Sequence, residues 1–251
     1  MGIRVIAKLD VKPPNVVKPV FYEGLKVIGN TRELVKKYFD QGADEIYYID
    51  IVASLYQRSM LLDEVQRSSE DIFIPFAVGG GVQSIEDFSE LFHHGADKVA
   101  INTFAINKDP EIIDKAAKIF GSQSVVVTVE AQRNGSGWQC MSDGGKILTE
   151  KNVLSWIKEV EDRGAGEVFI NSVDQDGSKT GFDIELADMV VSNLNIPVVV
   201  GSGAGKLEHI EELIKKVNPS GVAIASMLHY NDFTISDIKE HLFNNGIEVI
   251  R

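Results

Sequence analysis

The sequence has one cysteine, no long hydrophobic run and few basic side chains. Cys140 is the only cysteine among 251 residues, so a disulfide within the chain is excluded. No apolar run approaches the ~18 residues that a membrane-spanning helix needs, and the first residues lack the form of a signal peptide. We therefore expect a cytoplasmic protein with no membrane contact.

Acidic side chains outnumber basic ones by 37 to 25, which gives a formal net charge of −12 at pH 7. Nucleic acids and anionic membranes bind positive surfaces, so we expect no nucleic-acid partner. A small anionic substrate is compatible with this charge, because backbone N–H groups bind anions locally. The five histidines show no spacing typical of a metal site. We expect them to be solvated or to cap helices, and we expect no metal and no cofactor.

Short apolar segments alternate with segments of helical period along the whole chain. Parallel strands result from a β-then-α alternation, and eight such units of this total length close into a barrel. We therefore predict one α/β domain over residues 1–251, a (β/α)8 TIM barrel, with a doubly wound sheet as the alternative. The predicted strands are residues 4–9, 45–50, 76–78, 98–102, 124–130, 167–172, 197–201 and 221–225. The predicted helices include residues 31–41, 84–94, 110–119, 152–163, 183–193, 207–217 and 234–244.

The second half of the chain repeats features of the first half about 122 residues later. Gly42-Ala43 returns as Gly164-Ala165, and Asp10 has its counterpart in Glu130. An internal repeat predicts two similar halves of four β/α units each, related by a pseudo-two-fold axis. We expect half-barrels at about 1–121 and 122–251. Matching residues should then lie on opposite sides of the barrel mouth, which is the end of the barrel where the strands finish.

Two carboxylates are the first candidates for catalysis. Asp10 and Glu130 end the first and fifth predicted strands, where barrel enzymes carry their chemistry. Paired carboxylates divide acid and base roles when their environments separate their pKa values. The alternative is that both only accept hydrogen bonds at the top of the barrel. Asp50 and Asp174 are the next candidates, although the turn Asp174-Gln175-Asp176-Gly177 is equally typical of a structural role.

Two glycine-containing loops predict two phosphate sites. Glycines let backbone N–H groups approach an oxyanion, and a following helix N-terminus favours negative charge. For either loop alone, a tight turn explains the glycines equally well. The presence of the same feature in both halves favours phosphate binding. Barrel proteins also often bind phosphate with the loops after strands 7 and 8. The residues are Gly80, Gly81, Asn102 and Thr103 in the first half, and Ser202, Gly203, Ala225 and Ser226 in the second.

Motifs over nearly the whole chain resemble the cyclase subunit of imidazole glycerol phosphate synthase. They are Leu9-Asp10-Val11-Lys12, Val78-Gly79-Gly80-Gly81, Gly95-Ala96-Asp97-Lys98-Val99, Phe120-Gly121-Ser122-Gln123, Asp174-Gln175-Asp176-Gly177 and Gly203-Ala204-Gly205-Lys206. The resemblance implies a duplicated barrel that takes ammonia from a glutaminase partner. It also implies a substrate with two phosphates, which is converted into imidazole glycerol phosphate and an aminoimidazole carboxamide ribotide.

The resemblance assigns roles to particular residues. Asp10 matches a catalytic carboxylate, Lys18 a mobile first-loop lysine, and the two glycine loops, with Thr103 and Ser226, the phosphate sites. We also expect Asp50, Asp176 and Gly177 to contribute to substrate binding. At the starts of four strands, the resemblance implies a charged gate for ammonia above a docked glutaminase subunit. These residues are Arg4, Glu45, Lys98 and Glu167. The alternative is a ring of salt bridges that only caps the floor of the barrel.

Three features depart from the family pattern. Glu130 stands where the family has an aspartate, Lys8 replaces a usual cysteine, and the first loop reads Lys12-Pro13-Pro14 in place of a glycine-rich sequence. If Lys8 faces the barrel interior, its charge will lower the pKa of Asp10. These departures resemble paralogues of the family that take part in surface-polysaccharide synthesis. This second resemblance implies an alternative function, in which the protein conducts ammonia to a sugar amidotransferase that makes acetamidino sugars. A related sugar-phosphate isomerase barrel is a third alternative.

Overall fold

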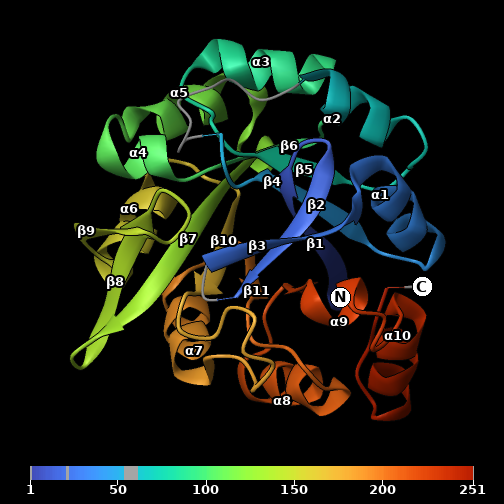
Figure 1. The fold of residues 1–251 in the computed structure, drawn as a ribbon. Coiled ribbons are helices and arrows are strands. Elements are labelled where there is room, and N and C mark those ends of the chain that lie inside the picture. The colour runs from blue at the N-terminus through green and yellow to red at the C-terminus, as the bar shows by residue number, and fades with distance from the viewer. Residues whose placement is uncertain (1, 21–22, 54–61, 251) are drawn as a thin grey trace.

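The computed structural model describes residues 2–20, 23–53 and 62–250. Its centre is a closed barrel of parallel strands, in which each strand pairs with the next and the last, β12, pairs with the first, β1 (Figure 1). The barrel prediction is therefore confirmed. In the described residues the barrel strands are β1 (Arg4–Lys12), β4 (Glu45–Asp50), β5 (Phe76–Gly79), β6 (Lys98–Ile101), β7 (Val125–Asn134), β10 (Glu167–Ser172), β11 (Val198–Gly201) and β12 (Gly221–Ile224).

Amphipathic helices surround the barrel, as Figure 1 shows. The expected ones are α1 (Thr31–Asp40), α3 (Ile85–His93), α5 (Glu111–Phe120), α6 (Val153–Asp162), α7 (Ile184–Asn193), α8 (Leu207–Val217) and α10 (Ile235–Asn244). The sequence did not indicate α2 (Leu62–Ser69), α4 (Thr103–Asn107), α9 (Ser226–His229) or the short 3-10 helix η1 (Ser122–Ser124). Most of these segments are too short for an apolar period to show. No helix in the described ranges has the length and apolar character required to cross a membrane.

Two antiparallel hairpins extend the barrel strands that carry the candidate carboxylates. The first is β2 (Asn15–Val20) with β3 (Glu23–Asn30), and the second is β8 (Gly137–Ser142) with β9 (Ile147–Asn152). Asp10 pairs with Val17 across β1 and β2, and Glu130 pairs with Met141 across β7 and β8. Neither hairpin was predicted. Because they occupy matching places, the internal repeat includes these additions as well as the barrel units.

The two sides of the barrel strands have separate apolar cores. Residues that point outward pack against the helices, while one of the inward-pointing residues of each barrel strand belongs to a buried apolar layer across the barrel. Along β1 this alternation places Arg4, Ile6, Lys8 and Asp10 on the inner side. The inner layer consists of Ile6, Tyr47, Ala77, Ala100, Val126, Phe169, Val199 and Ala223. It separates a charged floor from a polar mouth.

Candidate active site at the barrel mouth

Asp10 is buried at the mouth and is surrounded by positive charge. Its Oδ1 lies 2.7 Å from Nζ of Lys8, and its Oδ2 lies 3.7 Å from Nζ of Lys18. Burial alone raises the pKa of Asp10, but the ammonium groups of Lys8 and Lys18 outweigh burial and hold this pKa below its ordinary value. Asp10 is therefore a carboxylate at neutral pH, and Lys8 faces the barrel interior.

The pKa of Glu130 is shifted in the opposite direction to that of Asp10. Its Oε2 accepts hydrogen bonds from the backbone N–H of Gly145 at 2.8 Å and from the side-chain amide of Asn102 at 3.1 Å. Burial raises the pKa of Glu130 to about 7, although the hydrogen bond from Gly145 and the charge of Lys8 oppose this shift. The environments thus separate the two pKa values, which is the condition for a proton-donating and a proton-accepting carboxyl in one site.

A cavity of about 930 Å³ opens beside Glu130. Its volume suits a small-molecule ligand, since such pockets typically measure roughly 300–1,000 Å³. All four residues predicted for the first phosphate site line it, together with Asp50, Lys108 and the turn that begins at Asp143. Asp50 also has a structural role, because its Oδ1 accepts hydrogen bonds from the backbone N–H groups of Val52 and Ala53 at 3.1 and 3.0 Å.

The second predicted phosphate site forms a much smaller pocket of about 20 Å³. Lys18 reaches into it from β2, and its Nζ lies 2.9 Å from Oδ1 of Asp176. The lining residues include Lys8, Gly177, Ser202, Gly203, Ala225 and Ser226. Asp174 lines neither pocket, because its Oδ2 accepts a hydrogen bond from the backbone N–H of Arg133 at 2.8 Å.

Both loops contain a position that requires glycine. Gly80 has φ +108° and Gly203 has φ +103°, a region that favours glycine. A Cβ at Gly80 would lie 2.1 Å from the carbonyl oxygen of Asp50, and one at Gly203 would lie 2.0 Å from that of Gly181. The second loop also holds Ser202 at φ +73°. The glycines therefore make a close backbone approach that a side chain would prevent.

The helix N-termini at the site differ from those that the sequence indicated. The N-terminus of α3 is closed by a capping box between Ser84 and Asp87. The short helices α4 and α9 begin after Asn102 and Ala225, and neither has a side-chain cap. The first residue of α4 lines the larger pocket, and the first residue of α9 lines the smaller one. Barrels commonly bind phosphate at the N-terminus of such a short extra helix.

Several site residues were missed by the sequence argument. The turn of the β8–β9 hairpin supplies the N–H of Gly145 to Glu130 and the N–H of Asp143 to Oγ1 of Thr103, at 3.0 Å. His229 was expected to be solvated or capping, and this was wrong, because it is buried against Tyr38 with 2.7 Å between Nδ1 and Oη. Burial lowers the pKa of His229 to about 4, so it is neutral near Asp10. No local pattern marks these contacts.

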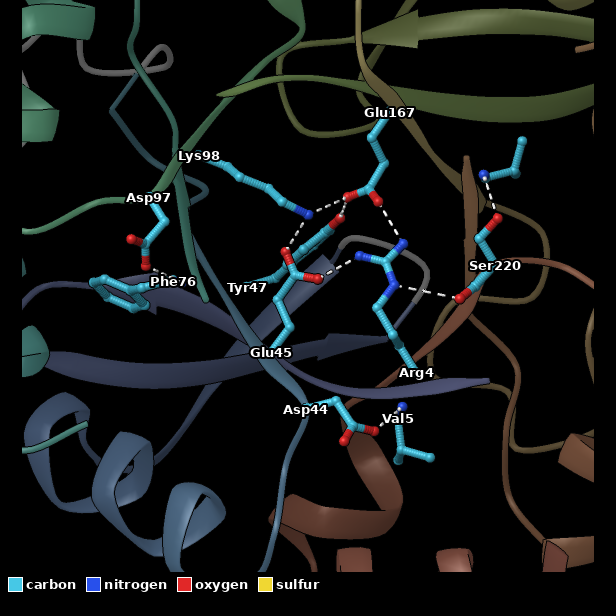
Figure 2. Close-up of polar contacts among 11 residues, drawn as sticks. Arg4, Val5, Asp44, Glu45, Tyr47, Phe76, Asp97, Lys98, Glu167 and Ser220 are labelled. Atoms are coloured by element: carbon cyan, nitrogen blue, oxygen red, sulfur yellow. Dashed lines mark hydrogen bonds and ion pairs between the residues drawn. The ribbon is translucent and has the colours of Figure 1, made fainter. Parts of the chain in front are cut away.

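The four predicted floor residues meet at the opposite end of the barrel (Figure 2). Arg4 and Lys98 each contact both Glu45 and Glu167. Arg4 Nη1 lies 2.6 Å from Glu45, Lys98 Nζ lies 2.7 Å from Glu45 and 3.1 Å from Glu167, and Arg4 also pairs with Glu167. Burial raises the pKa of Glu167, but the charges of Arg4 and Lys98 reverse this effect and lower it. The floor is a closed ring of two cations and two anions.

Comparison with known proteins gives one consistent result. The family model described as "Histidine biosynthesis protein" matches residues 4–234. A relative from Campylobacter concisus is 45% identical over 246 residues, and relatives from Thermococcus onnurineus and Pyrococcus furiosus are 42% identical over the same length. Each alignment covers 98% of this chain and 97% of the relative. All three relatives are named imidazole glycerol phosphate synthase subunit HisF.

Proposed function

The chain belongs to the histidine biosynthesis protein family, and from this premise we propose that it is the cyclase subunit of imidazole glycerol phosphate synthase. It combines ammonia with a bisphosphorylated ribulosyl-formimino aminoimidazole ribotide, and it releases imidazole glycerol phosphate, an aminoimidazole carboxamide ribotide and the ribulosyl carbonyl oxygen as water. The observation that carries this proposal is a pair of buried carboxyls, with pKa values shifted in opposite directions, between the two glycine loops.

Asp10 and Glu130 are the proposed catalytic residues. Ammonia loses protons as its nitrogen bonds to carbon, and Asp10 is ionised and able to accept a proton. The departing ribotide nitrogen needs a proton, and Glu130 carries one below about pH 7. Asn102 and the N–H of Gly145 hold Glu130 in place through both hydrogen bonds to Oε2.

The two ends of the substrate are proposed to lie in the two halves of the mouth. One phosphate lies on Gly80, Gly81 and Thr103 at the start of α4, and the other lies on Gly203 and Ser226 at the start of α9. Lys18 neutralises charge at the second site once it leaves Asp176, to which it is paired in this structure. The remaining proposed binding residues are Asp50, Asn102, Asp176, Gly177, Ser202 and Ala225, whereas Asp174 supports the site through its contact with β7.

A glutaminase subunit is the proposed source of ammonia. The relatives are each named as one subunit of a synthase, so a partner subunit belongs to the proposal. The proposed docking face is the barrel floor, where the ring of Arg4, Glu45, Lys98 and Glu167 closes the entrance. The surface-sugar alternative is not favoured, because the relatives that match nearly the full length carry the name of the histidine-pathway synthase subunit.

Turnover by the purified chain tests the proposal. The chain is supplied with an ammonium salt and the bisphosphorylated ribulosyl-formimino substrate, and imidazole glycerol phosphate is measured. We expect product without any glutaminase, because both carboxyls and both phosphate loops belong to this chain. A folded chain that binds the substrate and yields no product would contradict the cyclase assignment.

A further inference from the structure

The apolar layer inside the barrel separates the floor from the mouth. One residue from each barrel strand contributes to it, and all eight side chains are at most 4% exposed. Protein interiors are packed so densely that few voids exceed the size of a water molecule. A molecule that enters at the floor therefore crosses this layer only when a side chain moves aside.

Tyr47 and Phe169 are the two large aromatic side chains of the layer. They come from β4 and β10, both are fully buried, and their rings meet edge to face with 4.8 Å between centroids. Several of the other positions in the layer are alanine or valine. The aromatic pair consequently fills the space between strands that face each other across the barrel.

Tyr47 is also attached to the floor. Its hydroxyl donates a hydrogen bond to Oε1 of Glu167, the same oxygen that accepts from Lys98 at 3.1 Å (Figure 2). Burial and the neighbouring carboxylates raise the pKa of Tyr47 well above its ordinary value, so its hydroxyl keeps the proton that it donates. A movement of the Glu167 carboxylate therefore changes its contacts with the floor ring and its hydrogen bond with Tyr47 at the same time.

We propose that Tyr47 is an inner gate for ammonia, held closed by its hydrogen bond to Glu167 and by its contact with the Phe169 ring. This proposal rests on the proposed function, because it assumes that ammonia travels from the floor to Asp10 and Glu130. The apolar layer excludes the ammonium ion, since an unpaired charge there costs too much free energy. Neutral ammonia crosses when Tyr47 leaves Glu167 and turns away from Phe169.

Two substitutions change the gate in different ways. Tyr47→Phe keeps the ring and removes the hydrogen bond, whereas Tyr47→Val also opens the layer. When substrate covers the mouth, dissolved ammonia reaches the carboxyls through the floor, so both variants should raise kcat/KM for ammonia. We expect an increase of about tenfold, the scale on which loss of a hydrogen bond to a charged acceptor shifts an equilibrium. The KM for the ribotide should not change, which separates gating from a structural effect on the mouth.

Tyr48→Phe is the matched control. Tyr48 is the next residue on β4 and is also fully buried, but it points outward to the helices and lies edge to face against Phe76. This variant should keep the wild-type kcat/KM for ammonia. Thermal unfolding of every variant shows whether it is folded under the assay conditions.

A double variant tests the link between the gate and the floor. Lys98 and Tyr47 both donate hydrogen bonds to Oε1 of Glu167, so their effects should be coupled. The change in kcat/KM for ammonia in the double variant Lys98→Ala/Tyr47→Phe should therefore differ from the product of the changes in the two single variants. If the wild type turns over with ammonium but Tyr47→Phe and Tyr47→Val have the same ammonia kinetics as the wild type, the inner gate is wrong and the cyclase function stands. If the wild type shows no turnover, the cyclase function fails and the gate fails with it.

Discussion

Asp10 is ionised because Lys8 and Lys18 both lie against it. If it accepts a proton during turnover, Asp10→Asn should lower kcat by roughly 10²-fold or more, which is the contribution of a positioned proton-transfer group. Substrate affinity measured by calorimetry should change little, since the two proposed phosphate sites remain intact. An Asp10→Asn variant with wild-type kcat would remove Asp10 from the mechanism.

If Glu130 donates a proton, activity should depend on pH. Its pKa is raised to about 7, so its acidic form is present below this pH and is lost as the pH rises through it. We expect kcat to fall above about pH 7, and Glu130→Gln should lower kcat by roughly 10²-fold and remove this limb of the profile. A wild-type profile that stays flat between pH 6 and 8 would argue against a proton-donating Glu130.

The same ionisation should affect stability. The folded-state pKa of Glu130 lies above the ordinary value of 4.5, so its favourable contribution is full below 4.5 and is lost as the pH rises to about 7. Glu130→Gln should therefore stabilise the protein by roughly 2–3 kcal/mol more at pH 8 than at pH 4.5. Denaturant unfolding at both pH values measures this difference. An equal effect at both would mean that the pKa of Glu130 is not raised in the folded protein.

At the scale of elements, each proposed phosphate site combines a glycine loop after one strand, β5 or β11, with a short helix after the next strand, α4 or α9. Gly80→Ala and Gly203→Ala each place a Cβ against a backbone carbonyl, so each should weaken binding of a bisphosphorylated ligand by about tenfold or more. Gly135→Ala is the matched control, because Gly135 also has positive φ but no atom lies within 4 Å of the added Cβ. Calorimetry that finds one phosphate site, or none, would contradict the duplicated-site argument.

The hairpins are the second feature of this scale. The β2–β3 hairpin brings Lys18 to Asp10 and Asp176, and the β8–β9 hairpin brings Gly145 to Glu130. Each carboxyl is thus followed by an antiparallel extension of its own strand. The half-barrel boundary near residues 121 and 122 stays a prediction, and separate expression of the two halves addresses it.

At the scale of the whole molecule, the barrel connects two faces with different proposed tasks. Lys98 is the floor cation with a long, flexible stem, so it is the member of the ring best suited to swing aside. With a glutaminase bound, Lys98→Ala should impair glutamine-dependent synthesis more than ammonium-dependent synthesis. Both rates are measured on the same complex.

The control for this prediction is Lys158→Ala, which removes an exposed lysine from the middle of α6. It should leave the ratio of the two rates unchanged. Equal losses with both nitrogen sources in Lys98→Ala would reduce the ring to a structural cap of the floor. A glutaminase that forms no complex with the chain would contradict the proposed docking face.

The sequence alone was enough to predict the barrel. Its strands are apolar on both sides and its helices are amphipathic, and both patterns can be read from short segments of the chain. The repeat placed Asp10 opposite Glu130 in the same way, and the starts of four strands indicated the floor ring. Only the tertiary structure decided how these groups interact. It showed Lys8 facing inward, His229 buried, and Gly145 bonded to Glu130. These features depend on contacts between segments that lie far apart in the chain. Burial and neighbouring charges set the protonation of Asp10 and Glu130, and no local sequence pattern records them.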